Sequence, residues 1–376
     1  MPSRGPVLAV NLLWSVPGVG GSEEYLLRQL AGLAETSGDW TAEVFAPRGF
    51  SVRHPEVAAC FPVHEAPSDC SSRPVRIALE HTWLAARTRR FDAVLHGGGT
   101  VPLIGRRPAV LTIHDVQWVD HPGWVAPRKL RYLRAAVPRS ILRAARVTVP
   151  TRFVADSLTA AFGTDPSRIG VVRHGLEHDF GAQCTPADDL RRRFALGGGP
   201  VLVYPAITHP HKNHIFLLRL LAAGRGRWGD PSLRLVFIGS AGAAEDDVRR
   251  AVVDLGLGAR VAMPGRVETA DRNGLLAMAA ALVFPSEYEG FGAPVIEAMR
   301  LGTPVVASDR ACLPEVVGDG GITAPLDEAS WTAALDEAMQ RRDDLAARGR
   351  ARAALFTAAG SARDLIAVLD AARSAS

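Results

Sequence analysis

The sequence is poor in cysteine and has no long uninterrupted apolar run. Four cysteines are scattered through its 376 residues, and none of them forms a C-x-x-C pair; they are Cys60, Cys70, Cys184 and Cys312. This pattern excludes a disulfide-rich secreted scaffold, and a reduced cytoplasmic setting is the simpler interpretation. No apolar run approaches the ~18 residues that a membrane-spanning helix requires. We therefore expect a cytoplasmic protein.

A large excess of charge of one sign is also absent. The formal net charge is +4 at pH 7 and the isoelectric point is about 9.1, so the chain is mildly basic. That excess suits a phosphate-bearing ligand or an anionic membrane surface, but it is too small to indicate nucleic-acid binding. Lysine is scarce as well, since Lys129 and Lys212 are the only two. The length allows about two domains with a large core.

The N-terminal segment combines a short apolar run with a glycine-bearing loop. Residues 7–14 contain the run, which we interpret as a buried first strand rather than a signal peptide because no small-residue cleavage site follows. Residues 17–24 form the loop, and apolar residues at helical spacing follow it. A strand, a glycine loop and a helix in this order suit the approach of a phosphate group. A plain tight turn is the alternative.

A dinucleotide-binding fingerprint fits the same loop less well. G-x-G-x-x-G spacing requires a third glycine, but Gly18 and Gly20 are followed by Glu23 at that position. The mismatch disfavours a nicotinamide cofactor, because the third glycine is the one that allows close packing of helix on strand.

The next informative residue is His114, which follows the apolar run of residues 109–113. Short apolar runs alternate with helical patterns up to this point and predict a parallel α/β sheet. Ligands collect at the carboxyl edge of such a sheet, where a histidine can exchange hydrogen bonds with a sugar hydroxyl. A turn capped by His114 and Asp115 is the alternative. His96, which ends an earlier run, is a second candidate, for the acceptor side of a cleft.

The most informative stretch is residues 279–299, where an apolar run leads into a glycine-bearing loop and then into a helical pattern with Pro294 in its first turn. Free backbone N–H groups at such a helix N-terminus stabilise an anion. Glu289 in the loop and Glu297 in the helix can accept hydrogen bonds from hydroxyl groups. This combination suits a ligand with hydroxyl groups on both sides of a phosphate, such as a sugar nucleotide. Two merely solvated glutamates are the alternative.

Lys212 stands beside the expected start of a second helix. A compact cation at this place can neutralise a diphosphate leaving group without a metal ion. A surface lysine is the alternative. Three histidines, His209, His211 and His214, surround it in the sequence. They lack the carboxylate or thiol partners of a typical metal site, so we expect no metal.

These motifs together resemble a known family. Glu289 and Glu297, with Gly290, Phe291 and Gly292 between them, resemble the E-x7-E signature of retaining glycosyltransferases of family 4, which have the GT-B fold. Residues 211–213, 302–308 and 313–321 match neighbouring family motifs. The resemblance implies an α/β protein in which two doubly wound, Rossmann-like domains face a central cleft and a C-terminal helix crosses back to the first domain.

The resemblance also implies domain boundaries. Residues 1–182, with the helix of residues 356–376, would form the acceptor-binding domain. Residues 183–199 would form a linker, and residues 200–355 the domain that binds the nucleotide-sugar donor.

Roles for single residues follow from the same resemblance. Glu289, Lys212 and His114 would act at the reacting centre, as a donor-sugar ligand, a diphosphate ligand and a second donor-sugar contact. The donor-binding positions would be Gly20, Gly21, Asn213, Gly265, Val267, Gly290, Phe291, Gly292 and Glu297. Within this set Glu297 would hold the ribose, and the backbone from Gly265 to Val267 would lie against the base. Two positions depart from the family pattern: Ala206 stands where many members have arginine, and His174 where they have asparagine.

The resemblance therefore implies a retaining, metal-independent glycosyltransferase with no cofactor. Its donor would be a nucleotide-diphosphate sugar, and its acceptor a hydroxyl group of a glycan, a lipid-linked saccharide or a secondary metabolite. A catalytically degenerate nucleotide-sugar-binding protein, an NAD-dependent oxidoreductase and a sugar-nucleotide epimerase are the alternatives. The basic segment of residues 127–146, which Pro138 should kink or divide, is a candidate for peripheral contact with an anionic acceptor or the inner face of a membrane. A solvated helix face is the other interpretation.

Overall fold

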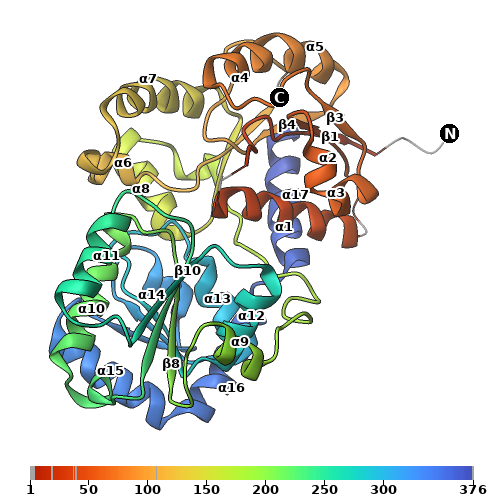
Figure 1. Cartoon of the computed structure of the whole chain (residues 1–376). Coiled ribbons are helices and arrows are strands. Elements are labelled where there is room, and N and C mark those ends of the chain that lie inside the picture. The colour runs from red at the N-terminus through yellow and green to blue at the C-terminus, as the bar shows by residue number, and fades with distance from the viewer. Residues whose placement is uncertain (1–4, 18–19, 37, 39, 107, 375–376) are drawn as a thin grey trace. The chain divides into compact units, whose positions relative to one another are not determined.

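The computed structural model describes residues 5–17, 20–36, 38, 40–106 and 108–374 (Figure 1). Gly18 of the possible dinucleotide fingerprint lies outside these ranges. The chain divides into two compact units. The first contains the residues up to Glu177 and those from Thr357 onward, and the second is His178–Phe356. No helix among the described residues combines the length and the apolar character needed to cross a bilayer.

The first unit is built on a parallel sheet of seven strands in the order β3-β2-β1-β4-β5-β6-β7. The strand order reverses between β1 and β4, and ligands bind at such switch points in open α/β sheets. The strands are β1 Val7–Asn11, β2 Thr41–Ala46, β3 Val63–Glu65, β4 Ala93–His96, β5 Ala109–Thr112, β6 Arg146–Val149 and β7 Ile169–Val171.

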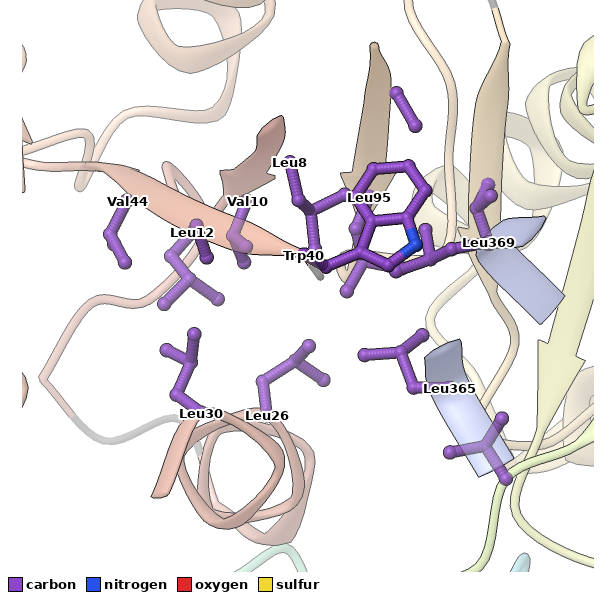
Figure 2. Close-up of a cluster of buried hydrophobic side chains, with 14 of the residues drawn as sticks. Leu8, Val10, Leu12, Leu26, Leu30, Trp40, Val44, Leu95, Leu365 and Leu369 are labelled. Carbon is purple, nitrogen blue, oxygen red and sulfur yellow. The ribbon is translucent and has the colours of Figure 1, made fainter. Parts of the chain in front are cut away.

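Helices cover this sheet and complete its core. Apolar side chains of β1 pack against α1 and against the C-terminal helix α17 (Figure 2). The α-helices are α1 Gly21–Glu35, α2 Phe50–Arg53, α3 Pro55–Cys60, α4 Arg73–Leu79, α5 Ala85–Arg87, α6 Gln117–Asp120, α7 Pro127–Arg143, α8 Arg152–Phe162 and α17 Ala358–Ser374. A π-helical turn, η1 Glu80–Leu84, and short 3₁₀ turns, η2 Thr88–Arg90, η3 Pro122–Trp124 and η4 Pro166–Arg168, complete the unit.

The C-terminal helix belongs to the first unit, as predicted. The Ser361 hydroxyl donates to the carbonyl of Arg173 at 2.6 Å, and the Trp40 indole donates to Asp370 at 2.9 Å. Helix α17 also approaches α1 so closely that a Cβ atom at Gly32 would lie 2.0 Å from the carbonyl oxygen of Ala358. Burial of these apolar faces, rather than helix propensity, holds α17 in place.

The second unit contains a parallel sheet of six strands in the order β10-β9-β8-β11-β12-β13. The strands are β8 Val201–Pro205, β9 Arg234–Ile238, β10 Val261–Gly265, β11 Ala281–Phe284, β12 Val305–Ser308 and β13 Ile322–Ala324. The helices are α9 Ala187–Arg193, η5 Pro210–Lys212, α10 His214–Ala223, η6 Gly226–Gly229, α11 Glu245–Asp254, α12 Thr269–Met278, α13 Ala293–Leu301, α14 Leu313–Val317, α15 Glu328–Gln340 and α16 Arg342–Ala353. Here the switch point lies between β8 and β11, and the most informative stretch of the sequence follows β11.

The predicted linker, residues 183–199, does not separate the units. It contains α9, whose Leu190 is fully buried, and the Thr185 hydroxyl donates to Asp271 of α12 at 2.6 Å. The segment is thus part of the second unit, and the boundary lies at Glu177 and His178 instead. The many charged residues of this segment suggested a solvated linker, because the one buried leucine of α9 gives no apolar periodicity in the sequence.

Pro138 does not divide the basic segment into two helices. Helix α7 runs through Pro138 from Pro127 to Arg143. Proline removes one backbone donor from the helix, the one that would reach the carbonyl of Arg134. The neighbouring carbonyls of Ala135 and Ala136 accept additional hydrogen bonds from the side chains of Arg139 at 2.5 Å and Ser140 at 2.7 Å.

Candidate active site

The loop between β11 and α13 has the geometry that its sequence predicts. Gly292 precedes α13 with φ +85°, a conformation that glycine adopts at no steric cost. A Cβ atom there would also lie 3.0 Å from Leu313. Helix α13 then begins at Ala293 with Pro294 in its first turn. Pro294 has no backbone N–H, and that of Val295 donates to the carbonyl of Gly292 at 2.9 Å, so it is the positive end of the helix dipole that favours an anion here.

Lys212 and Glu289 meet at this loop. The Lys212 ammonium lies 2.5 Å from a carboxylate oxygen of Glu289. Both side chains are largely buried, with 15% and 11% of their surfaces exposed. Sequence analysis assigned the two residues separate roles and did not anticipate their pairing. The two charges balance each other, and a diphosphate would compete with Glu289 for the ammonium group.

Tyr204, at the end of β8, holds the segments that carry this pair. Its buried hydroxyl donates to the carbonyl of Lys212 at 2.7 Å and lies 2.9 Å from the Ser286 hydroxyl. Ser308 in turn donates to the carbonyl of Ser286 at 2.5 Å. Burial, together with the negative charge of Glu289, raises the pKa of Tyr204 well above its usual value. The phenol therefore remains a hydrogen-bond donor at neutral pH.

Sequence analysis missed Tyr204, although a tyrosine at the carboxyl end of a buried strand is a recognisable signal. We expect Tyr204→Phe to lower the free energy of unfolding by about 1–3 kcal/mol, because the part-buried carbonyl of Lys212 and the buried hydroxyl of Ser286 lose their partner. Urea denaturation measures the effect. The matched control is Tyr132→Phe in α7, whose hydroxyl has no hydrogen bond within the described residues. Equal stability of the two variants would contradict a bridging role for Tyr204.

Glu297 lies one turn into α13 and is almost fully buried, with 2% of its side chain exposed. A guanidinium nitrogen of Arg272, in α12, lies 3.9 Å from one of its carboxylate oxygens. A buried carboxylate without a nearby cation would be costly, and Arg272 supplies that cation. Sequence analysis did not identify Arg272, because no local pattern indicates that α12 faces α13.

Other predicted donor-binding residues lie at the carboxyl ends of β8 and β10. Asn213 precedes α10 in a left-handed conformation with φ 58°. Gly265 ends β10 with φ +76° and accepts a hydrogen bond from the backbone of Gly239 at 3.0 Å. Val267 follows it and is half-buried. Gly239 and Gly265 line a small pocket together with Ala206, Thr208, Phe237, Glu245 and Met263.

The three histidines near Lys212 do not converge on one point. The rings of His209 and His211 stack with centroids 5.7 Å apart, whereas His214 turns inward against Tyr204 and Phe237. Burial lowers the pKa of His214 to about 4, so its ring is neutral. No cluster of three histidine, cysteine or acidic side chains that could hold a metal occurs in the part of the chain that the structure describes.

In the first unit, Gly20 and Gly21 stand at the start of α1. Gly20 caps the helix and Gly21 is its first residue. A Cβ atom at either position would meet nothing within 4 Å, so the surface there is open. Glu23, which replaces the third fingerprint glycine, lies 3.3 Å from His54 and 3.6 Å from Arg53.

His114 lies at the carboxyl end of β5. Its Nε2 atom lies 2.9 Å from the carbonyl of Gly97 and therefore carries the proton that it donates. Burial lowers the pKa of His114, so the ring is neutral and Nδ1 is an acceptor. A sugar hydroxyl would therefore donate to Nδ1. Asp115 does not bond to this ring but caps the next turn through the backbone N–H of Gln117, at 3.1 Å.

His96 and His174 both pack against other side chains of the first unit. His96 is 4% exposed, contacts Asn11 at 3.1 Å, and has its pKa lowered to about 3 by burial. Its Nδ1 atom is thus engaged in the core, while the residue also lines a small pocket beside the β4–β5 loop. His174, in place of the usual asparagine, packs on the ring of Tyr25 with centroids 4.4 Å apart.

The two parallel α/β sheets and the returning C-terminal helix define the GT-B class of fold, and solved structures share it. HepE of Anabaena, in complex with UDP-glucose, superposes with a TM-score of 0.76 over 97% of this chain and 99% of that chain, at 19% identity. WaaG, a glycosyltransferase involved in lipopolysaccharide biosynthesis, gives a TM-score of 0.69 over 96% and 99%, at 17% identity.

Sequence comparison identifies the family. The model of Glycosyltransferase Family 4 matches residues 19–180, and that of Glycosyl transferases group 1 matches residues 187–354. The O-antigen chain mannosyltransferase B of Escherichia coli is 31% identical over 71% of each chain. The D-inositol 3-phosphate glycosyltransferase of Jonesia denitrificans is 31% identical over 71% of this chain and 66% of its own. The chain belongs to this family of glycosyltransferases.

Proposed function

We propose that the protein is a retaining glycosyltransferase that transfers a sugar from a nucleotide-diphosphate sugar to a hydroxyl group of a glycan, a lipid-linked saccharide or a secondary metabolite. The observation that carries the proposal is the Lys212–Glu289 pair, at 2.5 Å, beside the N-terminus of α13. The pair brings a cation and a carboxylate together at the loop that leads into this helix. The complex of the similarly folded HepE with UDP-glucose supports a nucleotide-sugar donor.

Each group acts where charge or hydroxyl groups of the donor would lie. Lys212 and the N–H groups from Gly290 to Gly292 stabilise the diphosphate as it leaves, and such fixed electrostatic support commonly supplies the largest part of catalysis. Lys212 provides positive charge without a metal ion. Glu289 accepts from hydroxyl groups of the sugar and orients its ring. In the first unit, Nδ1 of His114 is an acceptor for a sugar hydroxyl, and the backbone at Gly20 and Gly21 is open to a phosphate group.

Retention of configuration follows from attack on the same face that the diphosphate leaves. The bond between the anomeric carbon and the phosphate oxygen breaks, and a bond from that carbon to the acceptor oxygen forms. The acceptor proton passes to the departing phosphate oxygen, so no protein nucleophile is needed. Exclusion of water from the site limits hydrolysis of the donor.

Thermal unfolding with a panel of UDP-, GDP-, ADP- and dTDP-sugars tests the proposal, with NAD as the control. A ligand at a hundred times its dissociation constant adds about 2.7 kcal/mol to the free energy of unfolding. We expect stabilisation by one nucleotide family, followed by turnover of that donor. Stabilisation by NAD alone, or by no nucleotide sugar, would overturn the proposal. Donor binding without turnover would indicate a catalytically degenerate binding protein.

Glu297→Ala should weaken binding of the nucleoside diphosphate about 5- to 150-fold, because the ribose hydroxyls lose a shared acceptor worth roughly 1–3 kcal/mol. Isothermal titration with the nucleoside diphosphate measures the loss. Inorganic pyrophosphate, which has no ribose, is the control ligand. A similar loss for both ligands would assign Glu297 a structural role beside Arg272 and not a ribose contact.

A further inference from the structure

The loop between β4 and β5 exposes two large apolar side chains at adjacent positions. Leu103 is 61% exposed and Ile104 is 63% exposed. Leu142, near the C-terminus of α7, is 76% exposed. Isolated exposed apolar residues are ordinary, but adjacent ones in a fixed loop mark an interaction surface more often.

Hydrogen bonds to α7 and η1 hold this loop in place, so its apolar tip is exposed because of how the loop is fixed. The Arg143 guanidinium, in α7, donates to the carbonyl of Pro102 at 3.2 Å and to that of Leu103 at 2.5 Å. The backbone N–H of Leu103 donates to His81 in η1 at 3.0 Å. The backbone N–H of Val101 donates to Ser140 in α7 at 2.9 Å. These bonds bring the apolar tip alongside the C-terminal end of α7, where Leu142 lies.

Helix α7, which lies beside this tip, carries a high density of positive charge. Its 17 residues include six basic side chains and no acidic one, and none of the six forms an ion pair within the described part of the chain. Arg128, Arg131, Arg139 and Leu142 are all exposed. Their spacing of three, eight and three residues places them along one face of the helix. Arginine side chains and an apolar side chain therefore point the same way.

Helix α4 lies next to α7 (Figure 1) and extends this surface. The Arg73 guanidinium stacks over the ring of Tyr132 of α7 at 5.1 Å, and Val75 of α4 is 42% exposed. We refer to Leu103, Ile104, Leu142 and the exposed cations Arg128, Arg131 and Arg139 as the apolar–basic face.

We propose that the apolar–basic face binds an anionic lipid bilayer peripherally. The arginines match the negative headgroups, and Leu103, Ile104 and Leu142 enter the boundary between headgroups and acyl chains. Nucleic acid would satisfy the arginines but offers no apolar layer for a protruding leucine and isoleucine. The proposal is independent of donor chemistry, because it concerns only α7 and the β4–β5 loop of the first unit. It places the enzyme at the surface where a lipid-linked acceptor would lie.

Co-sedimentation of the full-length protein with vesicles tests the proposal. Vesicles of phosphatidylcholine with about 30% phosphatidylglycerol are compared with vesicles of phosphatidylcholine alone, each at low and at high salt. The anionic lipid makes up about a third of the first kind so that its surface potential is strongly negative. We expect the protein to bind the anionic vesicles, and we expect added salt to weaken this binding. Binding to neither kind, or equal binding to both, would overturn the proposal.

Two sets of variants separate the apolar and basic parts. Leu103→Ser with Ile104→Ser should lower the vesicle partition coefficient at least about 10-fold. Arg131→Gln with Arg139→Gln should lower it about 30-fold. The matched controls are Val253→Ser with Leu355→Ser, at sites 77% and 57% exposed in the second unit, and Arg219→Gln with Arg348→Gln, exposed cations of the same unit.

The controls should bind vesicles like the unaltered protein. Thermal stabilisation by the donor should be the same in all variants, which shows that each is folded and keeps its donor site. If the basic variant loses binding and the apolar variant does not, and single-stranded DNA competes fully with the vesicles, the face is a nucleic-acid or polyanion site and the lipid proposal is wrong. A failed donor panel with normal vesicle binding would overturn the proposed function alone.

Discussion

Lys212→Ala is expected to lower kcat for sugar transfer by about 100- to 1000-fold, the range found when one fixed donor to a developing negative charge is removed. Lys212 is the cation that pairs with Glu289, and its ammonium group lies 2.5 Å from that carboxylate. Without it, the departing diphosphate loses the cation that would neutralise its charge. Release of the nucleoside diphosphate, followed at saturating donor, measures the effect.

The control for this variant is Arg348→Ala, which removes an exposed cation from α16 of the same unit. It should leave kcat unchanged, so a loss confined to Lys212→Ala cannot come from lower net charge. A melting temperature for Lys212→Ala close to that of the unaltered protein shows that the fold is intact. Near-normal kcat in this variant would remove Lys212 from the proposed mechanism.

Glu289→Ala is expected to reduce transfer by a similar factor, because the sugar loses the carboxylate that orients it and Lys212 loses the partner that positions its ammonium group. Kinetics of the single and double variants distinguish the two contributions. If the residues act as a unit, Lys212→Ala with Glu289→Ala should be little slower than either single variant. Effects that multiply would show that Glu289 and Lys212 act separately on sugar and diphosphate.

Glu289→Gln refines this test, since the amide keeps the size of the side chain and one acceptor oxygen but loses the charge. Partial activity in Glu289→Gln, with none in Glu289→Ala, would indicate that hydroxyl contacts matter more than the ion pair. Full activity in both variants would contradict the assignment of Glu289 to the reacting centre.

Local patterns in the sequence were sufficient to predict much of the fold. The parallel α/β class follows from alternating apolar runs and helical spacing. The start of α13 follows from Gly292 and Pro294, since the φ of +85° at Gly292 needs glycine and a first-turn proline suits a helix. The docking of α17 on the first unit was also expected, from the resemblance to the family. The packing of α9 was not, because one buried leucine, Leu190, in a charged segment is a weak signal.

The sequence by itself determined which chemical groups the second unit carries: a lysine beside one helix, a glycine loop before another, and two carboxylates eight residues apart. Only the tertiary structure decided which of them meet. Lys212 and Glu289 are separated by 77 residues in the sequence, and Tyr204 and Ser286 by 82. They come together because β8 pairs directly with β11, so that the loops after both strands leave the sheet at the same edge. Spacing along the chain records periodicity within a helix or strand, but strand order and register decide which loops become neighbours.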